Sequence, residues 1–243
     1  TRVVGDQLVI YTPFEPEDLV DRGNRPVIRR WSAADDFDAR ERRGRPILAA
    51  QDIHRPVFGV ENPTVHMISV CGLGNLDRDD LPCETTGFIA AGRAEMFVSP
   101  DSVFLATTAS DWRDNNSYAM CRQTGEGAVV SGDAPPGAVF RVPIGRGDPD
   151  LLAVRGQVID QFSMDQQGNR FRMVETTPRY ACGTRGWNPE TLPTRLELID
   201  ETVGSFTTTY RRAPERRFTA LPEAGAGMTE NRFVGEWLIY GTR

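Results

Sequence analysis

The stretch Arg2-Val-Val-Gly-Asp-Gln-Leu-Val-Ile-Tyr-Thr12 returns near the other end of the chain as Arg232-Phe-Val-Gly-Glu-Trp-Leu-Ile-Tyr-Gly-Thr242. The two share Arg, Val, Gly, Leu and Thr in register, with an acidic residue after the glycine. In each, a short apolar strand meets a glycine, which accepts the backbone angles of a tight turn, and a second apolar strand follows. This pattern is typical of a β-hairpin, and its recurrence indicates a protein built from repeats.

Two similar stretches lie between these ends. They are Phe97-Val-Ser-Pro-Asp-Ser-Val-Phe-Leu-Ala-Thr-Thr108 and Phe162-Ser-Met-Asp-Gln-Gln-Gly-Asn-Arg-Phe-Arg-Met-Val-Glu-Thr-Thr177. Two more strands are expected after each of the first three hairpins: 65–70 and 87–91, 118–122 and 138–142, 195–199 and 203–207. Hairpin plus two strands makes four antiparallel strands, the content of a β-propeller blade. The sequence therefore predicts an all-β protein of propeller blades in a partial ring of three to four.

The chain is expected to form a single propeller-like domain or segment over residues 1–243, with a polar insertion at about 13–64. Amphipathic crossover helices, which a parallel sheet would need, are absent from the pattern. A partial ring leaves strand edges open, and open edges pair with other chains. We therefore expect the remaining blades or a protein partner at residues 1–12 and 232–243, and we expect Trp237, in the last strand, to lie in the core.

Composition excludes two classes of partner. The net charge is −6 and the isoelectric point is near 5.1, whereas a protein that binds nucleic acid carries a basic surface. No run of about 18 apolar residues is present, so the sequence predicts no membrane span.

The four cysteines, Cys71, Cys83, Cys121 and Cys182, lack the paired spacing of a zinc site. Cys71 and Cys83 flank a short polar loop that a disulfide would close, and Cys121 with Cys182 would form a second bridge. Four buried thiols are the alternative. Disulfides would indicate an oxidising compartment.

The stretch Gly156-Gln-Val-Ile-Asp-Gln-Phe-Ser-Met-Asp followed by the strand closing in Glu-Thr-Thr177 resembles the signature of the secreted bacterial and archaeal beta-propeller domain family, distantly related to WD40 repeats. Glu175 stands where that family usually has alanine. The resemblance covers residues 94–243 well and the first 93 weakly. It implies an extracytoplasmic location (periplasm, cell surface or secreted), and it carries over no activity and no catalytic residues.

Two acidic loops collect oxygen atoms that calcium prefers as ligands. One contains Asp77, Asp79 and Asp80, and the other contains Asp111 and Asp114. Neither has the spacing of an EF-hand, and ordinary turn chemistry of Asp and Asn explains both. We therefore predict no cofactor, with Ca²⁺ as the alternative.

Trp112 and Trp187 fall in loops after the second and third hairpins, and in a propeller those loops could share one rim. An exposed ring beside Asp111 and Asp114 is suited to binding a glycan, since the ring supplies apolar area and the polar groups fix orientation. The alternative is that each tryptophan only caps its own blade. His66, in an alternating strand without a partner motif, is expected to be structural.

These observations favour an extracytoplasmic, non-enzymatic interaction or scaffold module. A carbohydrate or cell-wall binding module is the first alternative, and an extracellular hydrolase or metal-dependent enzyme is the second. Convergent carboxylates would favour the enzyme, although no known catalytic motif is present.

Overall fold

The structure is a computed structural model that describes residues 1–19, 26–29, 44–60, 62–74, 81–109, 121–123, 129–131, 135–181, 190–223 and 229–242. The described residues form β-strands and short 3-10 turns, with no α-helix among them, so the all-β prediction is confirmed. In this part of the chain no helix is long and apolar enough to cross a membrane. Residues 1–92, 100–103 and 142–148 form unit 1, and residues 93–99, 104–141 and 149–243 form unit 2.

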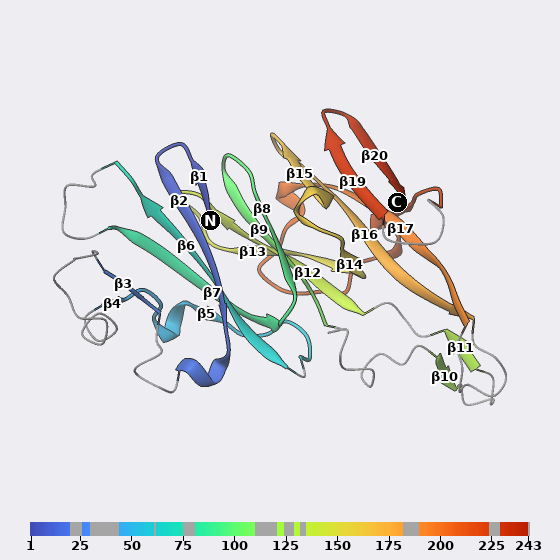
Figure 1. Cartoon of the computed structure of the whole chain (residues 1–243), viewed down its shortest axis with the longest axis horizontal. Helices are drawn as coiled ribbons and strands as arrows, with labels where there is room; N and C mark the ends of the chain where they lie inside the picture. Colours follow the sequence, from blue (N-terminus) through green and yellow to red (C-terminus); the bar gives the residue numbers. More distant parts are fainter. Residues whose placement is uncertain are drawn as a thin grey trace. The chain divides into compact units, whose positions relative to one another are not determined.

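Unit 1 is built on one sheet with the order β1-β2-β6-β7-β5 (Figure 1). Its antiparallel strands are β1 (Arg2–Val4), β2 (Gln7–Phe14), β6 (Pro63–Gly72) and β7 (Cys83–Ala91), and β5 (Ile53–His54) adds in parallel to β7. The ladder between β2 and β6 runs without a break from Gln7↔Gly72 to Phe14↔Val65. The hairpin and the two strands predicted to follow it are therefore confirmed, and both strands are longer than predicted.

The segment predicted as a polar insertion starts within β2 and ends within β6. Its described parts hold the turns η1 (Pro16–Leu19) and η2 (Ala50–Asp52) and two short paired strands, β3 (Val27–Ile28) and β4 (Arg45–Pro46). Between these two ends, the described part of the segment adds only the two-residue strand β5 to the main sheet, as a polar sequence with few apolar residues allows.

His66 lies fully buried in β6, as the structural interpretation predicts. Its Nε2 is 2.7 Å from the carbonyl oxygen of Ala91 and its Nδ1 is 2.8 Å from the hydroxyl of Tyr11. Burial lowers the pKa of His66, so the ring is neutral. A carbonyl only accepts, so Nε2 donates to Ala91 and Nδ1 accepts from Tyr11. Both ring nitrogens are thus used within the sheet.

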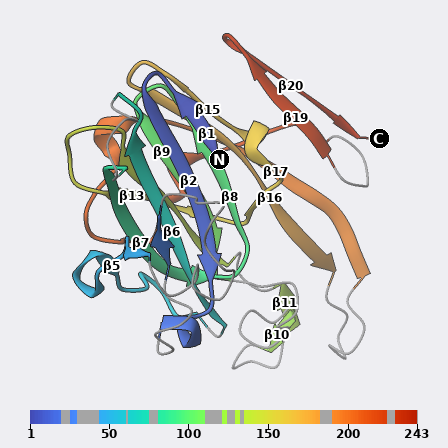
Figure 2. The same ribbon diagram turned by 60° about the vertical axis from the view of Figure 1, so that its left-hand side comes forward.

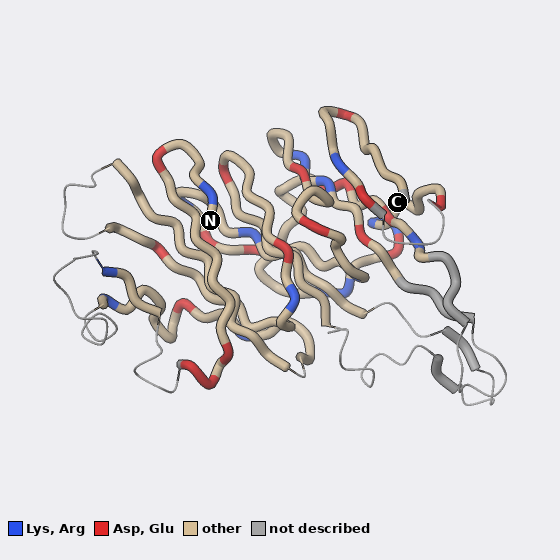
Figure 3. The backbone as a smooth tube through the Cα atoms, viewed as in Figure 1, with Lys and Arg blue, Asp and Glu red and all other residues tan. Residues whose placement is uncertain are grey.

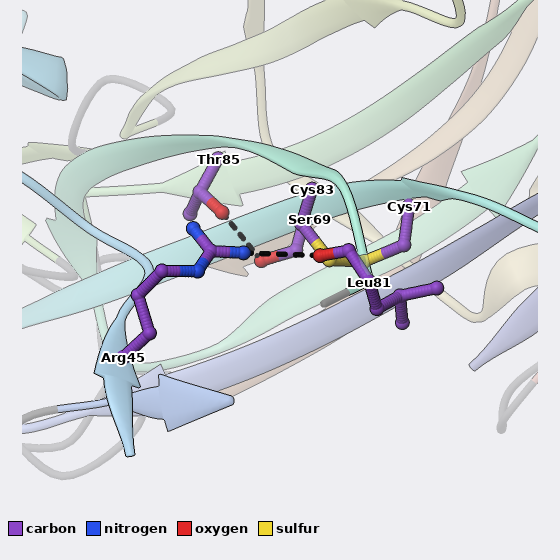
Figure 4. The surroundings of a disulfide bond; sticks show 6 residues. All are labelled: Arg45, Ser69, Cys71, Leu81, Cys83 and Thr85. Atoms are coloured by element: carbon purple, nitrogen blue, oxygen red, sulfur yellow. Dashed lines mark hydrogen bonds between the residues drawn. A yellow bond between two sulfur atoms is a disulfide. The ribbon is translucent and has the colours of Figure 1, made fainter. Parts of the chain in front are cut away.

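A disulfide joins Cys71 and Cys83, which lie directly opposite each other where β6 ends and β7 begins (Figure 4). The next pair of hydroxyls on the ladder, Ser69 and Thr85, is hydrogen-bonded at 2.9 Å. Arg45 donates to the carbonyl of Leu81 at 3.0 Å, in the loop that the disulfide closes. The first predicted bridge is confirmed. Cys182 and the side chain of Cys121 lie outside the described residues, so their pairing stays a prediction.

Removing the bridge should lower the free energy of unfolding. The cysteines are 12 residues apart, and closing a loop of that size stabilises a fold by about 3 kcal/mol through the unfolded state. We expect the free energy of unfolding of C71A/C83A to be about 2–3 kcal/mol lower than that of wild type. The variant should therefore unfold at a lower urea concentration. Reductant should remove most of the difference between wild type and the variant, since a Cys121–Cys182 bridge would be reduced in both. Equal midpoints for oxidised wild type and variant would contradict this.

Unit 2 holds most of a second four-stranded sheet, of order β13-β12-β9-β8 (Figure 1). Its strands are β8 (Ala94–Val98), β9 (Ser102–Thr108), β12 (Pro136–Pro143) and β13 (Asp150–Arg155). The strand predicted at 138–142 is confirmed as β12. Of the strand predicted at 118–122, residues 118–120 lie outside the described residues, and the rest belongs to β10 (Cys121–Gln123), which pairs with β11 (Val129–Ser131) in a separate two-stranded sheet. The apolar run of β13, buried at its four central residues, takes the place beside β12 instead.

The third sheet is centred on β16 (Arg170–Ala181), which pairs with β15 (Met164–Gln167) and β14 (Gln157–Val158) on one side and β17 (Glu190–Thr202) on the other. Its last strand is β18 (Phe218–Ala220). The strand predicted at 203–207 is wrong: η4 (Val203–Ser205) is a 3-10 turn, and Thr207 makes only an isolated bridge to Leu151. A glycine and a serine in that turn weaken it as a strand. The chain ends in the hairpin β19 (Thr229–Val234) and β20 (Trp237–Thr242).

The second and third sheets share one hydrophobic core within unit 2. Phe104 of β9 stacks on Phe171 of β16 with ring centroids 4.6 Å apart, and Phe206 meets both rings edge-on. The other buried members are Ala106, Val139, Leu152, Val154, Val158, Met164, Met173 and Ile199. These two sheets therefore bury their apolar faces against each other.

Three of the four repeat hairpins have the same turn. Gly5, Gly168 and Gly235 have φ of 58°, 56° and 56°, and each is followed by one polar residue in a two-residue loop. Glycine with positive φ at the first central position is the signature of a type II′ turn, whose twist suits antiparallel strands. The second hairpin replaces it with the three residues Ser99, Pro100 and Asp101 between β8 and β9. The four predicted hairpins are present, and among the described strands no sheet closes on itself.

Candidate functional site

The residues that the sequence singled out for ligand binding and for metal binding lie outside the described residues. They are Trp112, Trp187, Asp111 and Asp114 for the glycan, and Asp77, Asp79 and Asp80 for the metal. Within the described ranges, no three His, Cys, Asp or Glu side chains come together as a metal site would require. These predictions stay predictions, and the site described below consists of other residues.

The four repeat hairpins differ in the burial of one equivalent position, the third residue of the second strand. This position holds Val9, Phe104, Arg172 and Ile239. The first three are 0%, 0% and 3% exposed, whereas Ile239 is 62% exposed. The last hairpin therefore leaves open a position that the other three repeats bury.

In the third hairpin this position contacts the hairpin that follows. The Arg172 guanidinium lies 4.8 Å from the ring centroid of Phe233 and donates to the carbonyl of Gly235 at 2.6 Å. Gln167 donates to the same carbonyl at 3.1 Å, and Arg170 pairs with Glu236 at 2.6 Å. One face of β15–β16 thus holds the turn and the first strand of β19–β20 (Figure 2).

The second hairpin makes the equivalent contact with apolar chemistry. Its third-position residue, Phe104, stacks on Phe171, which belongs to the third hairpin. Each of these hairpins in unit 2 therefore uses the same face to bind its successor. We call this the docking face.

The docking face of the last hairpin is exposed and apolar. Val234, Trp237 and Ile239 lie on it, at 51%, 76% and 62% exposure. The expectation that Trp237 lies in the core is therefore wrong, although it is in a strand as predicted. We call these three residues the open face.

The opposite face of the same hairpin is anchored on unit 2. Asn231 is buried and donates to the hydroxyl of Ser163 at 2.8 Å, and Phe233 lies under Arg172. Because this anchored face fixes the hairpin, the open face is held as a defined surface of two strands joined by a tight turn.

A second cluster, which the sequence analysis missed, is ionic and buried. Arg155 binds both carboxylate oxygens of Glu197, at 2.7 and 3.1 Å, and its backbone N–H donates to Glu175 at 3.2 Å. Arg195 also pairs with Glu197, at 2.7 Å. Arginine suits this role because its planar group binds a carboxylate at two points. Figure 3 shows acidic and basic residues interspersed through unit 2.

Glu175 is the unusual member of this cluster. It is fully buried, and burial raises its pKa well above the ordinary value, with the nearby Glu197 carboxylate acting in the same direction. Its backbone hydrogen bond and the Arg155 and Arg195 charges oppose this shift without cancelling it. The alanine that the resemblance expects here is found one repeat earlier, at Ala106.

The arrangement of the two carboxylates does not form an active site in the described part of the chain. Glu175 and Glu197 are 0% and 2% exposed. The cavity beside Arg155 and Thr107 has a volume of about 20 Å³, room for roughly one water molecule. A substrate could not reach either acid without the sheet opening, so the cluster acts as a structural tie between β13, β16 and β17.

Unit 1 contains a wider hollow of about 900 Å³, next to the first hairpin turn. Asp6 and Glu84 line it with Arg45 and Arg146, so both signs of charge are present. This mixed lining favours neither an anion nor a cation as a ligand.

No family model, curated protein or solved structure matches the chain. The likeness to the secreted beta-propeller family therefore rests on the residues quoted above.

The buried acid gives stability a specific pH dependence. An unfolded glutamate titrates near 4.3, whereas Glu175 in the folded state keeps its proton to higher pH. The unfolded state therefore loses this proton first, and stability falls as the pH rises from about 4.3 toward the folded pKa, by up to about 1.4 kcal/mol per pH unit.

We expect Glu175→Gln, which resembles the protonated acid, to remove this loss. When urea unfolding is measured from pH 4.5 to 8, the free energy of unfolding of the variant should rise relative to that of wild type as the pH rises. Glu84 is exposed, so Glu84→Gln is the matched control, and its free energy of unfolding should change with pH as that of wild type does. A gap between Glu175→Gln and wild type that stays constant with pH would contradict a buried protonated Glu175.

Proposed function

We propose that this chain is an extracytoplasmic, non-enzymatic interaction or scaffold module built on β-propeller blades, and that its open face is the surface that binds a protein partner. The observation that carries the proposal is the exposure of Val234, Trp237 and Ile239 at a docking face that the other repeats bury. Contiguous exposed apolar side chains held on rigid strands are characteristic of protein interaction sites.

The repeat architecture supports the propeller part of the proposal. Three sheets each contain a hairpin followed in chain order by two further antiparallel strands, and two of these hairpins share the same glycine turn. Within unit 2, consecutive sheets pack face to face through Phe104 and Phe171, as neighbouring blades do. A propeller of this kind presents a rigid frame on which binding surfaces can be carried.

The disulfide supports the location. Cys71–Cys83 closes a loop in the first sheet, and such bonds persist where the environment is oxidising.

The test is site-specific photo-crosslinking on the full chain. A photoreactive residue at position 239 should trap protein partners from an extracytoplasmic extract, and unlabelled wild type in excess should compete. The same probe at Val27, an exposed apolar residue of β3, is the control. Equal trapping at both positions would contradict the proposal. Glycan binding that depends on Trp112 and Trp187, without trapping at 239, would favour the carbohydrate-binding alternative.

A further inference from the structure

We propose that the open face binds the first hairpin, β1–β2, of a second copy of this chain, so that copies associate head to tail. The inference rests on the proposed interaction function and names the partner of that same surface. It follows from the rule that a docking face in unit 2 binds the hairpin of the next repeat.

The β19–β20 hairpin shows which groups of a hairpin are contacted by the docking face that precedes it. We call these groups the receiving features. The preceding hairpin holds β19–β20 through Phe233, the carbonyl of Gly235 and the carboxylate of Glu236. All three lie on or beside the turn, so the contact needs only a hairpin with a tight glycine turn, an apolar residue before it and an acid after it.

The first hairpin has the same three features in register. Val3, Gly5 and Asp6 correspond to Phe233, Gly235 and Glu236 in the two aligned stretches. Gly5 and Gly235 have nearly the same φ, 58° and 56°, so the turn carbonyl is presented in the same way. Val3 is 64% exposed and Asp6 is exposed, whereas Phe233 is partly covered. The first hairpin thus carries the receiving features and leaves them accessible.

The two surfaces are complementary in their apolar part. In the docked pair within unit 2, Arg170 faces Glu236 and Arg172 faces Phe233. On the open face Trp237 and Ile239 stand at the positions of Arg170 and Arg172, so in the same register Ile239 would meet Val3 and Trp237 would lie beside Asp6.

Pairing between two open faces is less favourable than head-to-tail pairing. Beside the open face lies Arg232, which is opposite Ile239 in the ladder and whose guanidinium is 4.9 Å from the centroid of the Phe162 ring. Two open faces would bring two such cations to the same interface, whereas an incoming first hairpin brings the acidic Asp6. Head-to-tail contacts use two different surfaces, so they produce rings or open chains of copies.

The first experiment measures mass against concentration for the full chain, by light scattering and sedimentation from micromolar to submillimolar protein. Wild type should reach the mass of two or more copies. Ile239→Asp and Val3→Asp should each weaken association at least about tenfold, because each would bury an unpaired charge. Val27→Asp is the control and should behave as wild type. Circular dichroism and urea midpoints identify any variant that fails to fold.

The second experiment mixes the two variants. Val3→Asp keeps an intact open face and Ile239→Asp keeps an intact first hairpin, so the mixture should recover a one-to-one complex that neither variant forms alone. Pairing of two open faces would instead leave Val3→Asp associating as wild type does, which would overturn the proposal. A wild-type chain that stays monomeric at every concentration would also overturn it. Crosslinking from position 239 to another protein would still support the proposed function in that case.

Discussion

The structure depends on one recurring contact, in which the third residue after a hairpin turn packs on the next hairpin. Phe104 makes it with an aromatic stack on Phe171, and Arg172 makes it with a cation–π contact to Phe233 and a hydrogen bond to the turn carbonyl of Gly235. The two contacts differ in chemistry and in the strand they reach, and both join the same position of one hairpin to the next hairpin. Because each hairpin in this part of the chain stabilises its successor, the last hairpin carries a surface shaped for a contact that its own repeat does not make.

Two further constraints hold the repeats in place without taking part in that contact. The Cys71–Cys83 bridge closes the longest ladder of the first sheet at its end. The Arg155–Glu197 pair, with the buried Glu175 beside it, ties strands of the second and third sheets. A buried charge pair is a weak source of stability, but it penalises any packing in which its partners are separated. Both features favour rigidity, which a binding scaffold requires more than a catalyst that opens and closes.

The open face and the buried acids lead to opposite functional conclusions. Convergent carboxylates would favour an enzyme, but Glu175 and Glu197 are buried inside the protein, and Glu197 is bound by Arg155 and Arg195. Val234, Trp237 and Ile239 are exposed on a supported hairpin and are chemically unreactive. Their arrangement suits recognition of another β-surface, which is why the function we propose is binding.

The sequence by itself determined the hairpins and the first disulfide, because turn glycines, alternating apolar residues and a short cysteine-flanked loop are local signals. After the second hairpin it placed a strand correctly at 138–142 and missed the one at Asp150–Arg155, because only the pairing of strands decides which apolar runs join one sheet. It also placed Trp237 in the core, because a strand residue is buried only if another layer covers it. Tertiary structure alone decided that Ile239 and Trp237 are exposed while Val9 and Phe104 are buried. Burial depends on which element packs on a face, and equivalent positions of the hairpins have different neighbours.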